Sequence, residues 1–292
     1  MTLTVQVVIT PTEAKRLLSK AVLQLDEVKK ALDNGIIAVH PSSTTIFMLD
    51  ELGLKLPEER IWVCGHISPN GLCLSRKQID ERKDRPDWTG RMYAFDLIFR
   101  KGKLLPHAES ALGPILDEMT SEDLYIKSVN AIDPAGKAGV LLAARSTGGS
   151  IGMVLQAQKK NKFKMIIPVG LEKKIPIPLS QALAAAAKTQ RAQGIPCGLW
   201  QLRGKILTEI EAFRMLFDVE AIPISSGGVC GAEGAIVWVL TGEEKNVEKA
   251  YNLCTQIRAL GYKFPYELDV YNCKECPKDV CDFAGAKKVK KD

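Results

Sequence analysis

Residues 123–170 constrain the fold of this chain more strongly than any other segment, because strand-length apolar runs alternate there with turns and a helix-length segment. The apolar runs at 124–129 and 138–144 are separated by a turn at 133–136. A Ser/Thr/Gly loop and a helix-length segment then lead into a third apolar run at 164–170. Strands that alternate with helices are typical of an α/β protein with a mostly parallel sheet and helices on both faces.

The same alternation covers the rest of residues 1–205. Continuous apolar runs such as 35–40 are typical of strands that are buried on both faces of a parallel sheet. We therefore predict a Rossmann-like α/β ligand-binding domain over residues 1–205. Its other predicted strands are 5–9, 60–66 and 93–99, and its predicted helices are 11–32, 46–52 and 180–194.

Residues 208–260 show a different order, in which a helix, two strands with apolar alternation and a second helix follow one another. This order is the core of a ferredoxin-like α+β fold. We predict a small lid-like domain over residues 206–265, followed by a cysteine-containing segment and a basic tail over residues 266–292. The predicted helices are 208–217 and 247–260, and the predicted strands are 219–225 and 234–240.

Composition and charge exclude several classes of protein. Hydrophobic residues make up 46% of the 292 residues and charged residues 25%, which is typical of a globular chain. The net charge of +6 is modest, and the densest basic stretch, 76–91, also carries acidic residues, so we interpret it as a solvated loop and predict no nucleic-acid binding. No apolar stretch reaches the ~20 residues of a membrane span, and the N-terminal residues lack a leader pattern. We expect a cytoplasmic protein without a membrane partner. The sequence is compatible with a homo-oligomer.

The loop STGGSIG is the first candidate site, because it opens the helix that continues as MVLQAQ. Small residues let backbone N–H groups approach an anion, and hydroxyls can complete its hydrogen bonds. Arg145 can add a charge-assisted contact. The alternative is a capped helix start with a flexible turn. The candidate ligand-binding residues are Arg145, Ser146, Thr147, Gly148, Gly149 and Ser150.

The segment HPSSTT is the second candidate, and it also lies between a predicted strand and a predicted helix. In open parallel sheets, ligands bind in the crevice beyond the carboxyl ends of the strands, where this loop would lie. The alternative is a run of serine and threonine that only caps the helix. The candidate residues are Ser42, Ser43, Thr44 and Thr45.

His40 and His66 are the candidate catalytic residues, because each ends a predicted parallel strand. If both faced the same crevice, either could act as a general acid or base near neutral pH. The alternative is that both are hydrogen-bonded structural histidines.

The order GIIAVHPSSTTIFMLDEL followed by NAIDPAGKAGVLLAARSTGGSIG resembles the superfamily of ribose-5-phosphate isomerases and CoA transferases. NAIDPAGKAG is also similar to a segment of the lactate-utilisation-type proteins of that superfamily. The resemblance covers residues 35–170. It implies two phosphate-binding loops, with Asn130 and Asp133 in the motif before the second loop, and an inserted lid that corresponds to residues 208–260.

The sequence departs from the isomerase motif at the acidic residues that supply the proton-abstracting base. Asn130 and Ala131 occupy these positions, and an asparagine cannot take a proton. Arg145 lies nearest to the place of the family's lysine, and its pKa is too high for proton exchange. The usual isomerase mechanism is therefore disfavoured.

Glu233 is the only glutamate in a glycine-rich setting, and CoA transfer by the family mechanism would need a nucleophilic glutamate. The alternative is that Glu233 is only a hairpin residue. The surrounding segment 225–234 is either a lid over the crevice or a long mobile turn, since glycines at this density permit both.

Cys273, Cys276 and Cys281 form the third candidate site. Thiolates at this spacing can share a zinc ion or an iron–sulfur cluster. A closed zinc site needs a fourth ligand from elsewhere in the fold, with Cys64, Cys73, Cys230 or His66 as donors. The alternatives are a disulfide or thiols without a role.

These sites lead to three hypotheses of function. The first is that the chain binds a phosphorylated or carboxylated small molecule, such as a sugar phosphate or a CoA ester, between its two domains and acts as an isomerase or an acyl or CoA transferase. The second is a non-catalytic sensor or regulatory protein that binds the same small anionic metabolite. The third is a metal-binding or iron–sulfur accessory protein.

Overall fold

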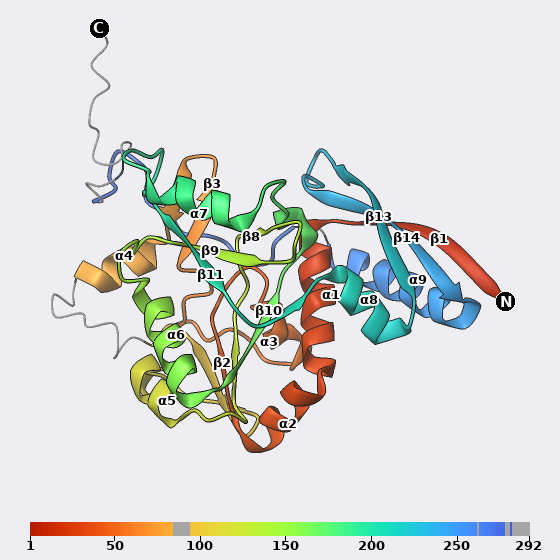
Figure 1. Cartoon of the computed structure of the whole chain (residues 1–292), viewed down its shortest axis with the longest axis horizontal. Coiled ribbons are helices and arrows are strands. Elements are labelled where there is room, and N and C mark those ends of the chain that lie inside the picture. Colours follow the sequence, from red (N-terminus) through yellow and green to blue (C-terminus); the bar gives the residue numbers. More distant parts are fainter. Residues whose placement is uncertain (84–93, 262, 278–280, 282–292) are drawn as a thin grey trace, which may run out of the picture.

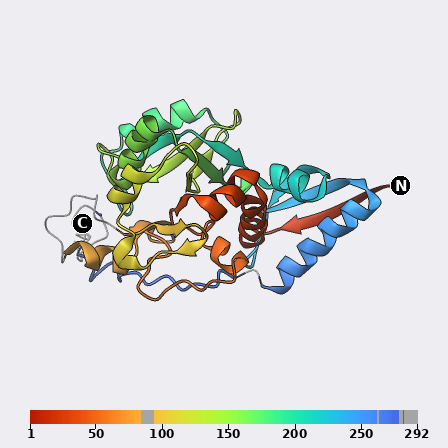
Figure 2. The same cartoon turned by 90° about the horizontal axis from the view of Figure 1, so that it is seen from below.

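The computed structural model of the chain describes residues 1–83, 94–261, 263–277 and 281. These residues form a mixed α/β protein with a six-stranded sheet, two three-stranded sheets and a separate β-hairpin (Figure 1). The six-stranded sheet and its helices make up the larger part of the molecule. One three-stranded sheet projects from it together with two helices (Figure 2).

The six-stranded sheet has the order β12-β10-β7-β2-β5-β6. The first four strands in this order are parallel, and β5 and β6 are antiparallel to their neighbours. The prediction of a mostly parallel sheet is therefore confirmed, with two antiparallel strands at one edge. Its strands are β2 (Ile36–Val39), β5 (Leu97–Arg100), β6 (Lys103–Leu104), β7 (Leu124–Ile126), β10 (Lys164–Pro168) and β12 (Lys205–Leu207).

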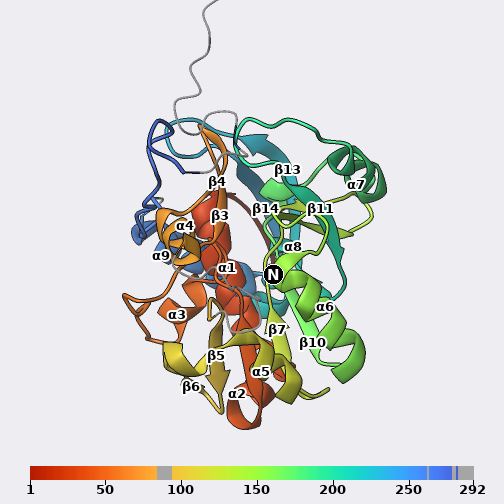
Figure 3. The same ribbon diagram turned by 90° about the vertical axis from the view of Figure 1, so that its left-hand side faces the viewer.

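Helices cover both faces of this sheet. Successive side chains of a strand point to opposite faces, so alternate residues of β2 pack against different helices. Ile37 and Val39 of β2 pack in the same core cluster as residues of α1 and α2. Ile36 and Ala38 pack in a second cluster with residues of α5 and α6. Figure 3 shows α5 and α6 together along one side of the strands. The bounds are α1 (Pro11–Gln24), α2 (Asp26–Asn34), α5 (Leu112–Glu118) and α6 (Gly149–Asn161).

The helix predicted over 11–32 consists of two helices in the structure. Thr10 caps α1 with a capping box that includes Glu13, as its position before Pro11 predicts. Leu25 adopts an extended conformation with φ −63° and ψ 132°, which separates α1 from α2. The break lets both helices present apolar side chains to the sheet. Leu25 itself is 5% exposed, so packing rather than a local breaker residue fixes this position.

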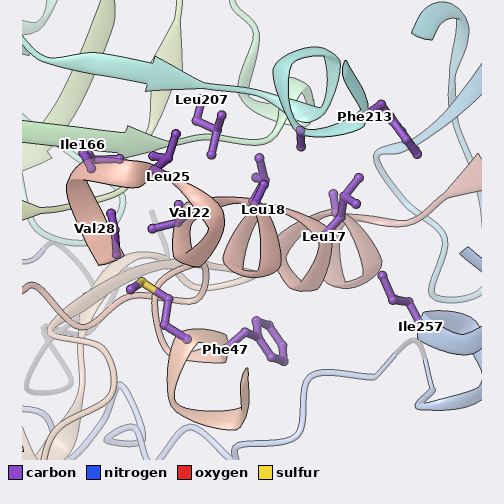
Figure 4. Close-up of a cluster of buried hydrophobic side chains, with 14 of the residues drawn as sticks. Leu17, Leu18, Val22, Leu25, Val28, Phe47, Ile166, Leu207, Phe213 and Ile257 are labelled. Carbon is purple, nitrogen blue, oxygen red and sulfur yellow. The ribbon is translucent and has the colours of Figure 1, made fainter. Parts of the chain in front are cut away.

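Helix α1 lies between the six-stranded sheet and the three-stranded sheet that projects from it (Figure 2). Figure 4 shows Leu18 and Leu25 near Leu207 and Ile166 of the main sheet, and Phe213 beyond the N-terminal part of the helix. All of these side chains belong to one buried cluster, which extends into the small three-stranded sheet. The two parts of the molecule therefore share a continuous core.

The small sheet has the order β1-β14-β13. The predicted order of helix, strand, strand and helix is present as α8, β13, β14 and α9. Strand β1 pairs antiparallel with β14 along its whole length, so the N-terminal strand of the predicted 1–205 domain contributes to the other sheet. The bounds are β1 (Thr2–Ile9), α8 (Glu209–Phe217), β13 (Glu220–Gly227), β14 (Ala235–Glu243) and α9 (Glu244–Ala259).

The strand predicted over 60–66 is wrong. Only its last two residues are in a strand, β3 (Gly65–Ser68), which pairs antiparallel with β4 (Gly71–Leu74) in a two-stranded hairpin. A tight turn at Pro69–Asn70 with Gly71 at φ 96° brings the chain straight back, so this segment does not enter the parallel sheet.

The remaining elements connect these layers. The solvated loop predicted over 76–91 is wrong for residues 76–83, which form helix α4. Residues 84–91 and the basic tail lie outside the described part of the chain.

The third sheet has the order β11-β9-β8. The bounds are α3 (Phe47–Glu51), α4 (Arg76–Lys83), β8 (Ala131–Ile132), β9 (Ala138–Leu142), α7 (Leu179–Ala187) and β11 (Gly198–Leu202), with 3-10 helices η1 (His107–Glu109) and η2 (Leu171–Lys173).

Among the helices of the described residues, none has the length and apolar character that crossing a membrane requires.

Candidate functional site

Two parallel strands end side by side at a pair of titratable residues. The amide of His40, the residue after β2, donates to the carbonyl of Ile126 at 2.9 Å. The amide of Lys127, the residue after β7, donates to the carbonyl of Ile166 in β10 at 3.1 Å. The hydrogen-bond ladder thus continues one residue beyond each strand. It fixes His40 and Lys127 at the carboxyl edge of the sheet.

Asp96 and Tyr125 hold the ring of His40. Nδ1 of His40 lies 2.6 Å from Oδ1 of Asp96, and the Tyr125 hydroxyl donates to Oδ2 of Asp96 at 3.1 Å. An ionised carboxylate only accepts, so Nδ1 carries the proton and Nε2 is the free acceptor of the ring. Burial lowers the pKa of His40, and Lys127 lowers it further against the opposing effect of Asp96. His40 is therefore an oriented, neutral imidazole at neutral pH.

Three consecutive parallel strands each contribute one residue to a second group of polar side chains. Thr44 follows β2, Ser128 follows β7, and Lys173 lies in η2 after β10. Nζ of Lys173 donates to Oγ of Ser128 at 3.1 Å and to Oγ1 of Thr44 at 3.3 Å. The Ser128 hydroxyl donates to Oγ1 of Thr44 at 3.1 Å. An ammonium and two hydroxyls therefore converge at the same edge as His40 and Lys127.

The two lysines of this edge both have lowered pKa values. Burial lowers the pKa of Lys127 to about 8, although Asp96 and Cys64 act in the opposite direction. Burial likewise lowers the pKa of Lys173 to about 8. Lys127 is 6% exposed, and its ammonium makes no hydrogen bond or ion pair with the other described residues. Its ammonium thus has no directly contacting counter-charge.

Two glutamates lie beside Lys173. The carboxylate of Glu209 accepts from the amide of Leu171 at 3.0 Å. Burial raises the pKa of Glu209 to about 8, and the nearby Glu172 raises it further. Both carboxylate oxygens of Glu172 are buried, and within the described residues they have no hydrogen-bond partner. The site therefore combines two ammonium groups with one carboxyl group, that of Glu209, which can exchange a proton near neutral pH.

Most of this site was not predicted from the sequence. One signal was available, since Lys127 and Ser128 are polar residues that directly follow a buried apolar run in β7. No comparable signal marks Asp96, Glu172 or Glu209, because the fold brings them to the site from distant parts of the chain. The residues that were missed are Asp96, Lys127, Ser128, Glu172, Lys173 and Glu209.

The HPSSTT segment contributes His40 and Thr44 to this site. The Ser42 hydroxyl accepts from the amides of Thr44 and Thr45 at 3.2 and 3.1 Å, and the Thr45 hydroxyl donates to the carbonyl of His40 at 2.6 Å. Ser43 is half-buried and makes no side-chain hydrogen bond with the described residues. Ser42 and Thr45 thus organise the loop, while Thr44 accepts from Lys173. The N-cap of the following helix α3 is Ile46, and no side chain of the described residues makes a capping hydrogen bond there.

The STGGSIG loop lies in another part of the fold. It follows β9, which belongs to an antiparallel sheet, and no hydrogen bond between described residues joins it to the HPSSTT segment. The Arg145 guanidinium donates to the carbonyls of Ala186 and Ala187 at 3.4 and 3.0 Å, at the end of α7. The side chains of Ser146 and Thr147 are exposed, Ser150 is half-buried, and Gly148 and Gly149 have positive φ at the start of α6. The two loops therefore follow strands of different sheets, and not strands of one parallel sheet.

Asn130 and Asp133 hold the backbone of the turn between β8 and β9. Oδ1 of Asn130 accepts from the amide of Leu141 at 3.0 Å. The Asp133 carboxylate accepts from the amides of Ala135, Lys137 and Leu179 at 2.9, 2.8 and 2.9 Å. These hydrogen bonds lower the pKa of Asp133, that from Leu179 having the largest effect. Both side chains are thus engaged with backbone groups.

Neither His66 nor Glu233 makes a hydrogen bond with the described groups of this edge. His66 is in the β3–β4 hairpin, so the expectation that it ends a parallel strand is wrong. Glu233 is an exposed residue of the loop between β13 and β14, where its carboxylate accepts from the amide of Gly231 at 2.8 Å. This contact fits the alternative in which Glu233 is a hairpin residue.

The three C-terminal cysteines line one cavity of about 170 Å³ beneath the β3–β4 hairpin. Cys73 and His66 line the same cavity. Burial raises the pKa of Cys273, and the nearby thiols of Cys73, Cys281 and Cys276 raise it further. Within the described residues, no three His, Cys, Asp or Glu side chains are already spaced to hold a metal ion.

The fold and the site together define a mixed α/β protein with a buried lysine- and hydroxyl-containing site at the carboxyl edge of its parallel strands. Comparison of the chain with protein-family models, with curated proteins and with solved structures found no match.

Proposed function

We propose that the carboxyl edge of β2, β7 and β10 binds a small phosphorylated or carboxylated molecule. The observation that carries this proposal is the side chain of Lys127, which is only 6% exposed and whose ammonium lacks a hydrogen-bond or ion-pair partner among the described residues. A buried charge without a partner is unfavourable. A phosphate or carboxylate of the ligand would supply the missing negative charge.

The neighbouring groups have the chemistry that such a ligand needs. Lys173 adds a second ammonium, and the hydroxyls of Ser128 and Thr44 can donate hydrogen bonds to anionic oxygens. In open α/β sheets, ligands bind beyond the carboxyl ends of the strands, which is where these groups lie. We also propose that the main sheet with its helices is Rossmann-like and that the small unit is ferredoxin-like.

Ligand-induced thermal stabilisation tests the binding proposal. Inorganic phosphate, pyrophosphate, sugar phosphates and CoA esters are titrated against the full chain. We expect at least one of these ligands to raise the melting temperature of the unmodified chain and to have no effect on Lys127→Met. Lys29→Met, at an exposed position on α2, is the matched control and should respond like the unmodified chain. If a ligand raised the melting temperature of Lys127→Met as much as that of Lys29→Met, the proposal would be refuted.

The contact between Ser128 and Lys173 favours acyl transfer as a second candidate function. A lysine with a pKa of about 8 is partly neutral near neutral pH and can take the proton of a serine that attacks an acyl group. This mechanism does not need the acidic base that the isomerase motif lacks. It is consistent with the transferase side of the superfamily that residues 35–170 resemble.

Covalent labelling with a fluorophosphonate distinguishes catalysis from simple binding. An activated Ser128 should be labelled in the unmodified chain, and the label should disappear in Lys173→Met. Ser180→Ala, which changes an exposed serine of α7, should keep the label. Stabilisation by ligands without labelling or conversion would instead support the non-catalytic sensor.

A further inference from the structure

A cavity outside the proposed anion site contains an unusual concentration of thiols. It has a volume of about 170 Å³, and its lining includes Cys73 from β4 and Cys273, Cys276 and Cys281 from the C-terminal segment. Figures 1 and 3 show this segment running beside the β3–β4 hairpin. Residues about 200 positions apart in the sequence therefore meet in one place.

The hairpin presents a second potential ligand to the same cavity. His66 and Cys73 are direct partners in the antiparallel register of β3 and β4, so their side chains lie on the same face. Both ring nitrogens of His66 are buried, and neither has a hydrogen-bond partner within the described residues. A buried imidazole without a partner at a thiol-lined cavity is unfavourable unless another group binds there.

Specific contacts hold the C-terminal segment in this position although it contains no helix or strand in its described part. The amide of Arg76 donates to the carbonyl of Asp269 at 2.9 Å, and Nε of Arg76 donates to the Asp269 carboxylate at 3.0 Å. The Tyr271 hydroxyl donates to the Asp80 carboxylate. The cysteines that follow are thus positioned at the cavity by contacts of the C-terminal segment with α4.

We propose that Cys73, Cys273, Cys276 and Cys281 together bind one thiolate-coordinated metal centre, either a zinc ion or an iron–sulfur cluster. Four thiolates complete the ligand set that both centres use, and Cys73 supplies the fourth ligand that the C-terminal cysteines lack. Each thiol releases its proton when it binds the metal. Within the described residues no three His, Cys, Asp or Glu side chains are placed to hold a metal ion, so the proposal requires the four thiols to move closer together when the metal binds.

Metal analysis of the full chain purified without oxygen tests this proposal. We expect about one zinc ion, or the iron and sulfide of one cluster, per chain. A colourless zinc-containing sample and a brown sample with visible absorption distinguish the two kinds of centre. Apo protein titrated with Co²⁺ should develop the visible absorption of a thiolate complex.

Substitutions identify the ligand set. Cys73→Ser and Cys276→Ser should each lose most of the bound metal and the Co²⁺ spectrum. Cys230→Ser, at an exposed cysteine in the loop between β13 and β14, is the matched control and should retain both. Circular dichroism verifies that each variant is folded, and Cys276 lies outside helices and strands, so its substitution leaves the sheets intact.

Two outcomes would overturn the proposal. One is an unmodified chain that holds neither zinc nor iron after purification and gives no spectrum with Co²⁺. The other is a Cys73→Ser variant that keeps the full metal content, since the C-terminal cysteines would then bind without β4. Either result leaves the proposal for the anion site unaffected, because Lys127 and Lys173 lie at another edge of the fold.

Discussion

At the scale of single residues, the site is defined by titratable groups whose pKa values the fold shifts toward neutrality. Lys127 and Lys173 have pKa values of about 8, and burial is the largest cause for both. Glu209 has a pKa of about 8 for the same reason. The sequence shows the identity of these residues but not their pKa values, which depend on burial and on neighbours from distant segments. For this reason the sequence predicted His40 and Thr44 at this edge and missed the lysines.

Replacing Lys127 by methionine should raise the free energy of unfolding at neutral pH by about 1–3 kcal/mol, because the buried charge is removed. The pKa falls from 10.5 in the unfolded chain to about 8 in the fold, so below pH 8 the unmodified chain bears the full cost. Between pH 8 and 10.5 the lysine is neutral in the folded chain but still protonated in the unfolded chain. The cost therefore decreases steadily over this range and is absent only above pH 10.5. The advantage of the variant should therefore shrink above pH 8 in urea unfolding.

Replacing Glu209 by glutamine should have the opposite dependence on pH. The pKa rises from 4.5 to about 8 on folding, so the unmodified chain loses stability as pH rises through this range. Glutamine keeps an acceptor for the amide of Leu171 and has no proton to lose. The variant should gain about 1–3 kcal/mol over the unmodified chain by pH 8 and little at pH 4. Glu248→Gln, exposed on α9, is the control; a gap independent of pH would contradict the assignment.

At the scale of elements, the sequence predicted strands most accurately where a continuous apolar run corresponds to a single strand. β2, β7 and β10 lie within the predicted ranges, because strands buried on both faces are continuously apolar. The apolar run at 60–66 failed because its partner strand lies only a turn away, and the sequence does not show which pairing wins. The break at Leu25 failed because packing of α1 and α2 against the sheet decides it.

The start of α6 gives a prediction at this scale. Gly148 has φ 74°, and an added Cβ would lie 2.7 Å from the Trp200 ring, so Gly148→Ala meets both strain and a clash. Gly53 has φ 68° with no atom within 4 Å of the added Cβ. Gly148→Ala should lower the free energy of unfolding by about 2–4 kcal/mol, and Gly53→Ala by about 1 kcal/mol. Equal losses in thermal unfolding would show that the Trp200 contact is not restrictive.

At the scale of the whole molecule, β1 and α1 join parts that the sequence divides at residue 205. β1 pairs with β14, and the buried cluster around α1 includes Trp238 of the small sheet and Leu124 of the main sheet. Pairing between residues over 200 positions apart leaves no local pattern, so the sequence predicted the order of elements in the small unit but not its third strand. The shared core predicts that both sheets unfold together.

Substitution of Leu18 tests this cooperativity. Leu18 is completely buried in α1, and Leu18→Ala should cost about 2–5 kcal/mol. Far-ultraviolet circular dichroism and Trp fluorescence should then report one coincident transition at a lower urea concentration. Leu260→Ala, 62% exposed, should leave the transition nearly unchanged. Two separate transitions would contradict a shared core.

Calorimetric titration with inorganic sulfate as a function of pH tests the central claim most directly, because sulfate keeps its charge while the lysines titrate. We predict that the unmodified chain binds sulfate at neutral pH, that affinity falls about tenfold or more as pH rises past 8, and that Lys127→Met does not bind. The same affinity in the unmodified chain and in Lys127→Met, or an affinity independent of pH, would contradict an anion site at this edge of the sheet.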